Sequence, residues 1–308
     1  MTRCRVLFLA LVVAVVGLLG LVACGRTTPV SGLARIRAAG VIKWGGDIQG
    51  GEPYVYGDPK SPDRLIGFEV EIADAIAREL GVRAEFVQND WANLVPSLER
   101  GSFDIVMNGL EVTEARVGRV RFTRPYCVFT ERLMARAGNA SIAPDLLALR
   151  GKKVGTLANS LAFEMLRGTA TPVVYDGVEE PYLDLVNGRT DAVLLDDIIA
   201  TRYGAPRPEL QVVGDLREGY YAIAVRPSDP DLAAAIDDAI GAIAARGELR
   251  RILERSHLWN DRQDRLIGWT AADQTRMLGA PRSPPPIERG HVMLFLRGAG
   301  VTLLVSTL

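Results

Sequence analysis

The stretch FEVEIADAIARELGVRAEF, at residues 68–86, determines the fold class. Apolar side chains recur in it every four positions, at Phe68, Ile72, Ile76 and Leu80. This spacing predicts one apolar face of a helix, which Gly81 would end. The alternating apolar residues at 82–86 then predict a strand. A helix followed directly by a strand is the building unit of α/β proteins.

The same alternation continues on both sides of this unit. Short apolar runs predict further strands at 41–44, 103–107, 153–157, 173–175, 192–195 and 221–225. Helical spacing predicts further helices at 94–98, 160–166, 182–186 and 232–243. The two halves of the chain share this arrangement without sharing sequence. The pattern therefore predicts α/β layers around a largely parallel sheet.

The N-terminal segment predicts export. Arg3 and Arg5 precede an apolar run at 6–19, which ends in Leu21-Val22-Ala23-Cys24. Positive charge, apolar run and small residue are the order of a signal peptide. The last four residues resemble the lipobox of bacterial lipoproteins, which implies acylation of Cys24 and anchoring to the cell membrane by the lipid. An ordinary signal peptide and a transmembrane anchor are the alternatives. We expect a signal peptide at 1–23 and a tether at 24–32.

Net charge, cysteine content and histidine content argue against several kinds of binding site and partner. Removing residues 1–23 takes 2 arginines from 36 basic residues against 37 acidic ones, which leaves a net charge of about −3. Nucleic-acid partners are not expected, because they require a basic face. Cys127 is then the only thiol apart from Cys24, so no disulfide framework is expected. The only histidines, His257 and His291, lie far apart, and neither a metal site nor a cofactor is expected.

Six fragments in a fixed order resemble one family. They are LIGFEVEIA (65–73), WANLVPSL (91–98), NGLEVTEAR (108–116), FTRPY (122–126), LRGKKVG (149–155) and NGRTDAVLLD (187–196). Together, over about residues 33–264, they resemble the family 3 extracellular solute-binding proteins, which bind polar amino acids for ABC importers. The resemblance implies an amino-acid-like ligand, with an ABC transporter permease and ATPase as partners, and no enzymatic activity.

The resemblance also implies the fold. It is the α/β periplasmic-binding-protein type II fold, with two lobes that each contain a mixed sheet flanked by helices. Two hinge strands join the lobes, and we expect them near 129–134 and 219–224. Lobe 1 would then comprise 33–131 and 225–265, lobe 2 would comprise 132–224, and a tail would follow at 266–308. Such a hinge lets a ligand shift the protein from an open to a closed form.

A free amino acid brings a carboxylate, which an arginine fork and backbone amides at a helix start bind well. Arg116 follows Thr113, a residue suited to cap a helix, and a cation in the first turn opposes the helix dipole. We therefore expect Arg116 to hold the ligand carboxylate, unless it only pairs with a nearby acid. Asn159, Ser160 and Leu161 lie between a strand and a helix in the second lobe. They would add backbone amides, or else form a plain helix cap.

The ligand ammonium group requires a carboxylate, and Asp196 ends an apolar strand where α/β sheets bind ligands. Its alternative role is to cap the following helix. The resemblance also implies that Trp91 forms a wall of the pocket, although core packing is an equal alternative. It implies that Asp47 contacts the ligand side chain and that Tyr54 or Tyr56 replaces a missing aromatic wall. Two further ligand-binding residues carried over from the family are Asn108 and Gly109.

Glu111 is the clearest departure from the family, which commonly has a small hydroxyl residue at this position. Its carboxylate would repel a ligand carboxylate unless Arg116 or a cationic group compensates. One hypothesis is that Glu111, together with Asp47, selects a cationic or unusually polar ligand. The other is that Glu111 and Arg116 form a structural pair.

The sequence leaves two other functions as alternatives. An exported cyclic-acid dehydratase on the same fold would need a positioned acid such as Glu111 or Asp196, and a ligand-sensing domain would need an output domain. The chain contains no Gly-x-Ser-x-Gly motif and no nucleotide-binding loop with Gly-Lys-Ser/Thr. Residues 295–308 resemble the start of the first membrane helix of amino-acid ABC permeases, which suggests a truncated fusion; an irregular tail on the membrane surface is the alternative.

Overall fold

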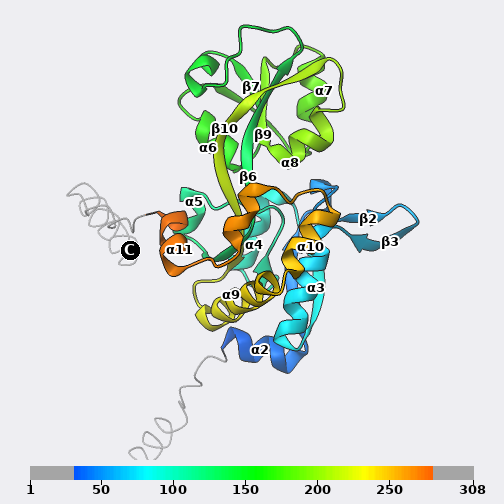
Figure 1. The fold of residues 1–308 in the computed structure, drawn as a ribbon, viewed down its shortest axis with the longest axis vertical. Coiled ribbons are helices and arrows are strands. Elements are labelled where there is room, and N and C mark those ends of the chain that lie inside the picture. The colour runs from blue at the N-terminus through cyan, green and yellow to red at the C-terminus, as the bar shows by residue number, and fades with distance from the viewer. Residues whose placement is uncertain (1–30, 280–308) are drawn as a thin grey trace, which may run out of the picture. The chain divides into compact units, whose positions relative to one another are not determined.

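The computed structural model describes residues 31–279, and Figure 1 shows their arrangement. The predicted signal peptide, Cys24, most of the tether and residues 280–308 lie outside the described residues. Residues 31–270 belong to one compact unit, and Ala271 begins a second unit. In the second unit, α11 (Ala271–Leu278) is the described helix. Among the described residues, no helix combines the length and the apolar character needed to cross a bilayer.

Helices and strands alternate through the first unit. Its helices are α2 (Gly32–Ala39), α3 (Phe68–Leu80), α4 (Leu94–Glu99), α5 (Glu114–Val117), α6 (Leu161–Leu166), α7 (Glu180–Val186), α8 (Asp197–Ile199), α9 (Pro230–Ala245) and α10 (Glu248–Arg255). Its strands are β1 (Val41–Gly46), β2 (Tyr56–Asp58), β3 (Ser61–Ile66), β4 (Arg83–Gln88), β5 (Ile105–Val106), β6 (Arg121–Arg136), β7 (Lys153–Leu157), β8 (Thr171–Tyr175), β9 (Ala192–Asp196) and β10 (Leu210–Val225).

The helix predicted from the opening stretch is confirmed as α3. All four residues of its apolar stripe are buried, and each contributes about 1.5–3 kcal/mol by leaving water. Gly81 ends the helix in the left-handed conformation, at φ +72°, and its N–H bonds to the last turn. The strand predicted after it is β4, which pairs in parallel with β1.

One continuous sheet runs through the unit. Its strand order is β4-β1-β5-β10-β6-β9-β7-β8. The predicted parallel character is found at both ends, where β1 pairs with β4 and β5, and β7 pairs with β8 and β9. The centre is antiparallel, because β6 pairs with β10 and also with β9. The sheet is therefore mixed.

The long strands β6 and β10 connect two groups of elements. In Figure 1, β7, β9, α6 and α7 lie at one end of this pair, and α3, α4, α9 and α10 lie at the other. The sequence indicated only the last part of β10, at 221–225, but the strand begins at Leu210. The remainder was missed because register shifts interrupt its alternation, for example between Val212 and Gly214. The exact boundaries of the lobes stay a prediction.

After α10 the chain returns to the connecting strands. Gln263 is buried, accepts a hydrogen bond from the Val128 N–H at 2.9 Å and donates one to the Val128 carbonyl at 2.6 Å. Leu266 is also buried, and Trp269 packs edge-on against Tyr220 of β10 with ring centroids 5.5 Å apart. These contacts attach the end of the first unit to both β6 and β10.

Candidate ligand-binding site

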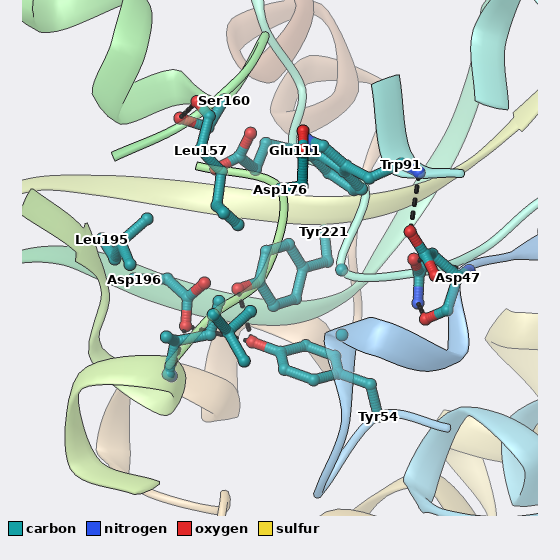
Figure 2. A pocket seen from close by; sticks show the side chains of 15 residues that line it. Asp47, Tyr54, Trp91, Glu111, Leu157, Ser160, Asp176, Leu195, Asp196 and Tyr221 are labelled. Atoms are coloured by element: carbon teal, nitrogen blue, oxygen red, sulfur yellow. Dashed lines mark hydrogen bonds between the residues drawn. The ribbon is translucent and has the colours of Figure 1, made fainter. Parts of the chain in front are cut away.

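A cavity of about 40 Å³ lies between the two groups of elements (Figure 2). Most of the predicted ligand residues line it: Asp47, Tyr54, Trp91, Asn108, Gly109, Glu111, Ser160 and Asp196. Three predicted residues do not line it: Arg116, Asn159 and Leu161. The cavity is also lined by residues that the sequence did not indicate: Gly50, Leu157, Asp176, Val178, Leu195, Ile199 and Tyr221.

Asp196 ends β9 and reaches the cavity. Its Oδ1 accepts hydrogen bonds from the Tyr54 hydroxyl at 3.0 Å and from the Ile199 backbone N–H at 2.8 Å. The Tyr54 hydroxyl also lies 3.0 Å from the Tyr221 hydroxyl, and Figure 2 shows these groups converging. Burial raises the pKa of Asp196 to about 6. Asp196 therefore caps α8 and also presents a carboxylate to the cavity, so both predicted roles are compatible with its position.

Asp47 follows β1 and organises the opposite wall. Its Oδ2 accepts a hydrogen bond from the Trp91 backbone N–H at 2.8 Å. Its Oδ1 accepts from the Gln88 amide and the Gln49 backbone N–H, each at 3.0 Å. Among the described residues, no lysine or arginine forms an ion pair with Asp47. Its negative charge is held by neutral donors only.

Glu111 and Arg116 form a buried pair, as one of the two hypotheses stated. Arg116 Nη1 lies 3.3 Å from Glu111 Oε2 and donates to the Glu111 carbonyl at 2.9 Å. The same Oε2 accepts a hydrogen bond from the Leu161 backbone N–H at 2.8 Å. Arg116 Nη2 donates to the Asn159 carbonyl at 2.9 Å. Arg116 therefore faces Glu111 and Asn159 and does not line the cavity.

Trp91 completes this cluster. Its ring lies 5.0 Å from the Arg116 guanidinium carbon, in a cation–π contact. Its indole N–H donates to the Ala158 carbonyl at 2.7 Å. Bonds from Trp91, Glu111 and Arg116 thus reach the loop at 158–161 from the other side of the cavity. This cross-cavity bonding is the arrangement of a closed cleft.

The predicted cap at Thr113 is wrong in one respect. Thr113 is the N-cap residue of α5, but its side chain makes no capping hydrogen bond. Its buried hydroxyl has no hydrogen-bond partner within the described residues. The side chain of Arg116, which lies in the short α5, is positioned by its bonds to Glu111 and Asn159. Ser160, in contrast, does cap α6, because its hydroxyl accepts a hydrogen bond from the Phe163 N–H at 3.0 Å.

Asn159, in the loop before α6, has a backbone conformation that few residues other than glycine adopt. Its φ is +57°, in the left-handed region where glycine is commonest and asparagine is among the most tolerated other residues. This conformation directs the Asn159 carbonyl to Arg116. The side chain of Asn159 is not among those that line the cavity.

The buried carboxyl groups raise one another's proton affinity. Burial raises the pKa of Glu111 to about 7, with Arg116 and the Leu161 N–H opposing the effect and Asp196 adding to it. Glu131, on β6 directly beside Asp196, is completely buried. Burial and then the charges of Glu111 and Asp196 raise the pKa of Glu131 well above its ordinary value. The Ala162 N–H opposes this rise.

Among residues 31–279, no group of three or more His, Cys, Asp or Glu side chains is arranged to hold a metal ion. The single described thiol, Cys127, is buried on β6, and burial raises its pKa well above the ordinary value.

The sheet crossed by two long strands, with a cavity lined from both sides, defines a class: the two-lobed α/β solute-binding proteins. The chain belongs to the bacterial extracellular solute-binding proteins, family 3, whose family model matches residues 44–257. This confirms the family indicated by the six sequence fragments. Members of this family act outside the cytoplasm.

Known proteins agree with this assignment. The chain is 31% identical over 212 residues to the L-arginine-binding protein of Pseudomonas aeruginosa, which covers 64% of this chain and 81% of that protein. A mutant of the arginine-binding protein ArgBP from T. maritima has a TM-score of 0.67 at 27% identity, over 73% of this chain and 99% of that one. These likenesses confirm the predicted type II fold.

A third likeness bears on enzymatic activity. An ancestral amino acid-binding protein, described as a precursor of cyclohexadienyl dehydratase, has a TM-score of 0.65 at 27% identity. It covers 73% of this chain and 99% of its own. These three similar proteins are thus described as binding proteins, and one of them as a precursor of an enzyme.

Proposed function

We propose that this protein captures a small, positively charged, amino-acid-like solute outside the cytoplasm and delivers it to an ABC transporter. The observation that carries the proposal is the Asp196 carboxylate, which is 6% exposed and meets the Tyr54 hydroxyl at the cavity. Within residues 31–279 no lysine or arginine forms an ion pair with Asp196, and a buried carboxylate of this kind is suited to an ammonium or guanidinium group of a ligand.

The remaining lining supports a cation. Asp47, Glu111 and Asp176 bring further carboxylates to the cavity, and none of its described lining residues is a lysine or an arginine. Trp91 and Tyr54 offer aromatic faces, on which cations are also favourable. The arginine ligand named for two of the similar proteins has a cationic side chain that fits such a lining. We assign the ligand-binding role to these residues together with Asn108 and Gly109.

Delivery would follow from hinge closure about β6 and β10. A ligand that contacts residues before and after β6, such as Tyr54 and Asp196, binds the closed form better and so increases its population. The proposed partners are the permease and the ATPase of an importer, which would recognise the closed form. We further propose that the lipid on Cys24 anchors the protein to the membrane near that permease.

We propose that the protein is not an enzyme. A dehydratase of cyclic acids would have to receive a carboxylate-bearing substrate, and this cavity is lined by four acidic residues. Glu111 has a pKa raised to about 7, which would suit a general acid, but it is bonded to Arg116 and Leu161. Turnover of a cyclic acid by the purified protein would contradict this part of the proposal.

The test is thermal unfolding of the purified full-length protein with the common amino acids, polyamines and cyclic acids. A ligand at about a hundred times its dissociation constant adds roughly 2.7 kcal/mol to the free energy of unfolding. We expect cationic solutes to raise the unfolding temperature and acidic solutes to leave it unchanged. Stabilisation by aspartate, glutamate or a cyclic acid alone would refute a cationic ligand.

A further inference from the structure

Glu111 already supplies an anion to donors that an amino-acid ligand would use. Glu111 is 5% exposed, and its carboxylate bonds both to Arg116, which precedes β6, and to the Leu161 N–H, which follows β6. Arg116 and the amides of 159–161 are the groups that the sequence indicated for a ligand carboxylate. In the closed cleft, a protein side chain takes the place of that carboxylate.

Arg116 is already engaged by the protein through both of its terminal nitrogens. One terminal nitrogen donates to the Glu111 carbonyl at 2.9 Å and lies 3.3 Å from the Glu111 carboxylate. The other terminal nitrogen donates to the Asn159 carbonyl at 2.9 Å. One face of the guanidinium group lies against Trp91. Both terminal nitrogens are therefore engaged by the protein.

The charges around the cavity also disfavour a ligand carboxylate. The carboxylates of Asp47, Glu111, Asp176 and Asp196 line it, and no basic residue among residues 31–279 does. A ligand carboxylate placed beside Glu111 would meet like charge in a buried site, where such repulsion lowers affinity strongly. A ligand amine or guanidine meets only opposite charge.

We infer that the cavity takes an organic cation without a carboxylate, and that Glu111 provides the carboxylate that an amino acid would bring with it. The cationic group binds at Asp196 and Tyr54, and a second cationic group of a diamine reaches Asp47 on the opposite wall. The inference rests on the proposed function, because it names the chemical class of solute for that same site. It makes Glu111 the residue that determines specificity.

The alternative is that Glu111 is a displaceable latch. A ligand carboxylate would then push the Glu111 side chain away from Arg116 and Leu161 and take over both bonds. Glu111 would slow or weaken binding without changing which solute is preferred. The two accounts differ in whether removal of the ligand carboxylate strengthens binding to the native protein.

Pairs of solutes that differ only by that carboxylate provide the test. Isothermal titration calorimetry on the full-length protein compares agmatine with arginine, putrescine with ornithine, and cadaverine with lysine. We expect the decarboxylated member of a pair to bind more tightly, by on the order of a hundredfold. The preference should shrink in Glu111→Gln, which keeps the size of the side chain without its charge.

Glu111→Ser should reverse the preference, since it frees Arg116 and Leu161 for a ligand carboxylate. Glu99→Gln is the matched control, because Glu99 pairs with Arg119 at the surface, 2.7 Å away, and does not line the cavity. Both dissociation constants should stay unchanged in this control. If Glu111→Ser does not fold by circular dichroism, Glu111→Gln provides the comparison.

Three outcomes count against the inference. Arginine binding at least as tightly as agmatine to the native protein overturns it and leaves the proposed function intact. An agmatine preference that is unchanged in both Glu111 variants overturns the role of Glu111. Absence of binding by every amine and amino acid overturns the inference and the proposed function together.

Discussion

Replacing Asp196 with asparagine removes the charge at the end of β9 and keeps its capping geometry. The asparagine oxygen can still accept the Ile199 N–H, which bonds to Asp196 at 2.8 Å, and asparagine caps helices about as well as aspartate. The free energy of unfolding should therefore change by less than about 1 kcal/mol. A bound cation loses a buried charge partner, which costs about 2–5 kcal/mol. At about 1.4 kcal/mol per factor of ten, affinity should fall by roughly 30-fold to several thousandfold.

Calorimetric titration and urea denaturation measure these two quantities separately. Because the charged carboxylate binds the cation and burial raises the pKa of Asp196 to about 6, affinity of the native protein should rise as the pH increases through 6. That rise should be smaller in Asp196→Asn. The neighbouring Asp197 pairs with Arg262 and accepts a hydrogen bond from the Thr130 N–H at 3.1 Å. Asp197→Asn is the control, and it should lower stability without changing affinity.

The reasoning is refuted if Asp196→Asn keeps the native affinity for every cationic solute. It is also refuted if the variant loses several kcal/mol of stability while its affinity is unchanged. Either result would reduce Asp196 to the cap of α8 and remove the main support for a cationic ligand.

Three further predictions concern closure and stability. Glu131→Gln should flatten the pH dependence of the free energy of unfolding in urea. Because burial raises the pKa of Glu131, the native state holds a proton that the unfolded chain releases above about pH 4.3, and native stability falls as the pH rises from there towards the folded-state pKa. Trp91→Phe removes the 2.7 Å bond to the Ala158 carbonyl, worth about 1 kcal/mol, and should increase the radius of gyration measured by X-ray scattering without ligand. Gly67→Ala should cost about 3 kcal/mol or more, because φ is +133° and the added Cβ would lie 2.0 Å from a backbone oxygen. Thermal unfolding measures this loss of stability. The control is Gly101→Ala, where φ is +81° and the added Cβ meets no atom within 4 Å; it should cost only about 1 kcal/mol of stability.

Local signals made much of the fold predictable. Helix α3 followed from a four-residue spacing and a closing glycine, both of which lie within one short stretch. Strand β7 occupies Lys153–Leu157, the range that the sequence indicated. Strand β10 was found only in part, because its pairing partner β6 lies far away in the sequence and its register shifts break the alternating pattern.

The candidate site was likewise predictable only in part from the sequence. Glu111 and Asp196 lie within the family fragments, and the resemblance also indicated Asp47 after the first strand; all three line the cavity. Tyr221 was missed because a strand in the centre of a sheet is apolar on both faces, so the pattern does not show which side chain turns to the cavity. The bonding of Glu111 to Leu161 was also inaccessible, because it depends on how closely residues before and after β6 approach each other.

The joining of the two halves by paired strands has a mechanical consequence. A flexible tether would let one half sample many distances from the other, and closure would then require a loss of chain entropy. Here β6 and β10 are hydrogen bonded to each other from the pair Arg121–Val225 to the pair Arg136–Leu210. The connection can therefore bend as a two-stranded unit, but its length is fixed. Because the paired strands hold the two walls of the cleft close together, the effective concentration of one wall at the other is high. The few bonds across the cleft then determine how often it stands open.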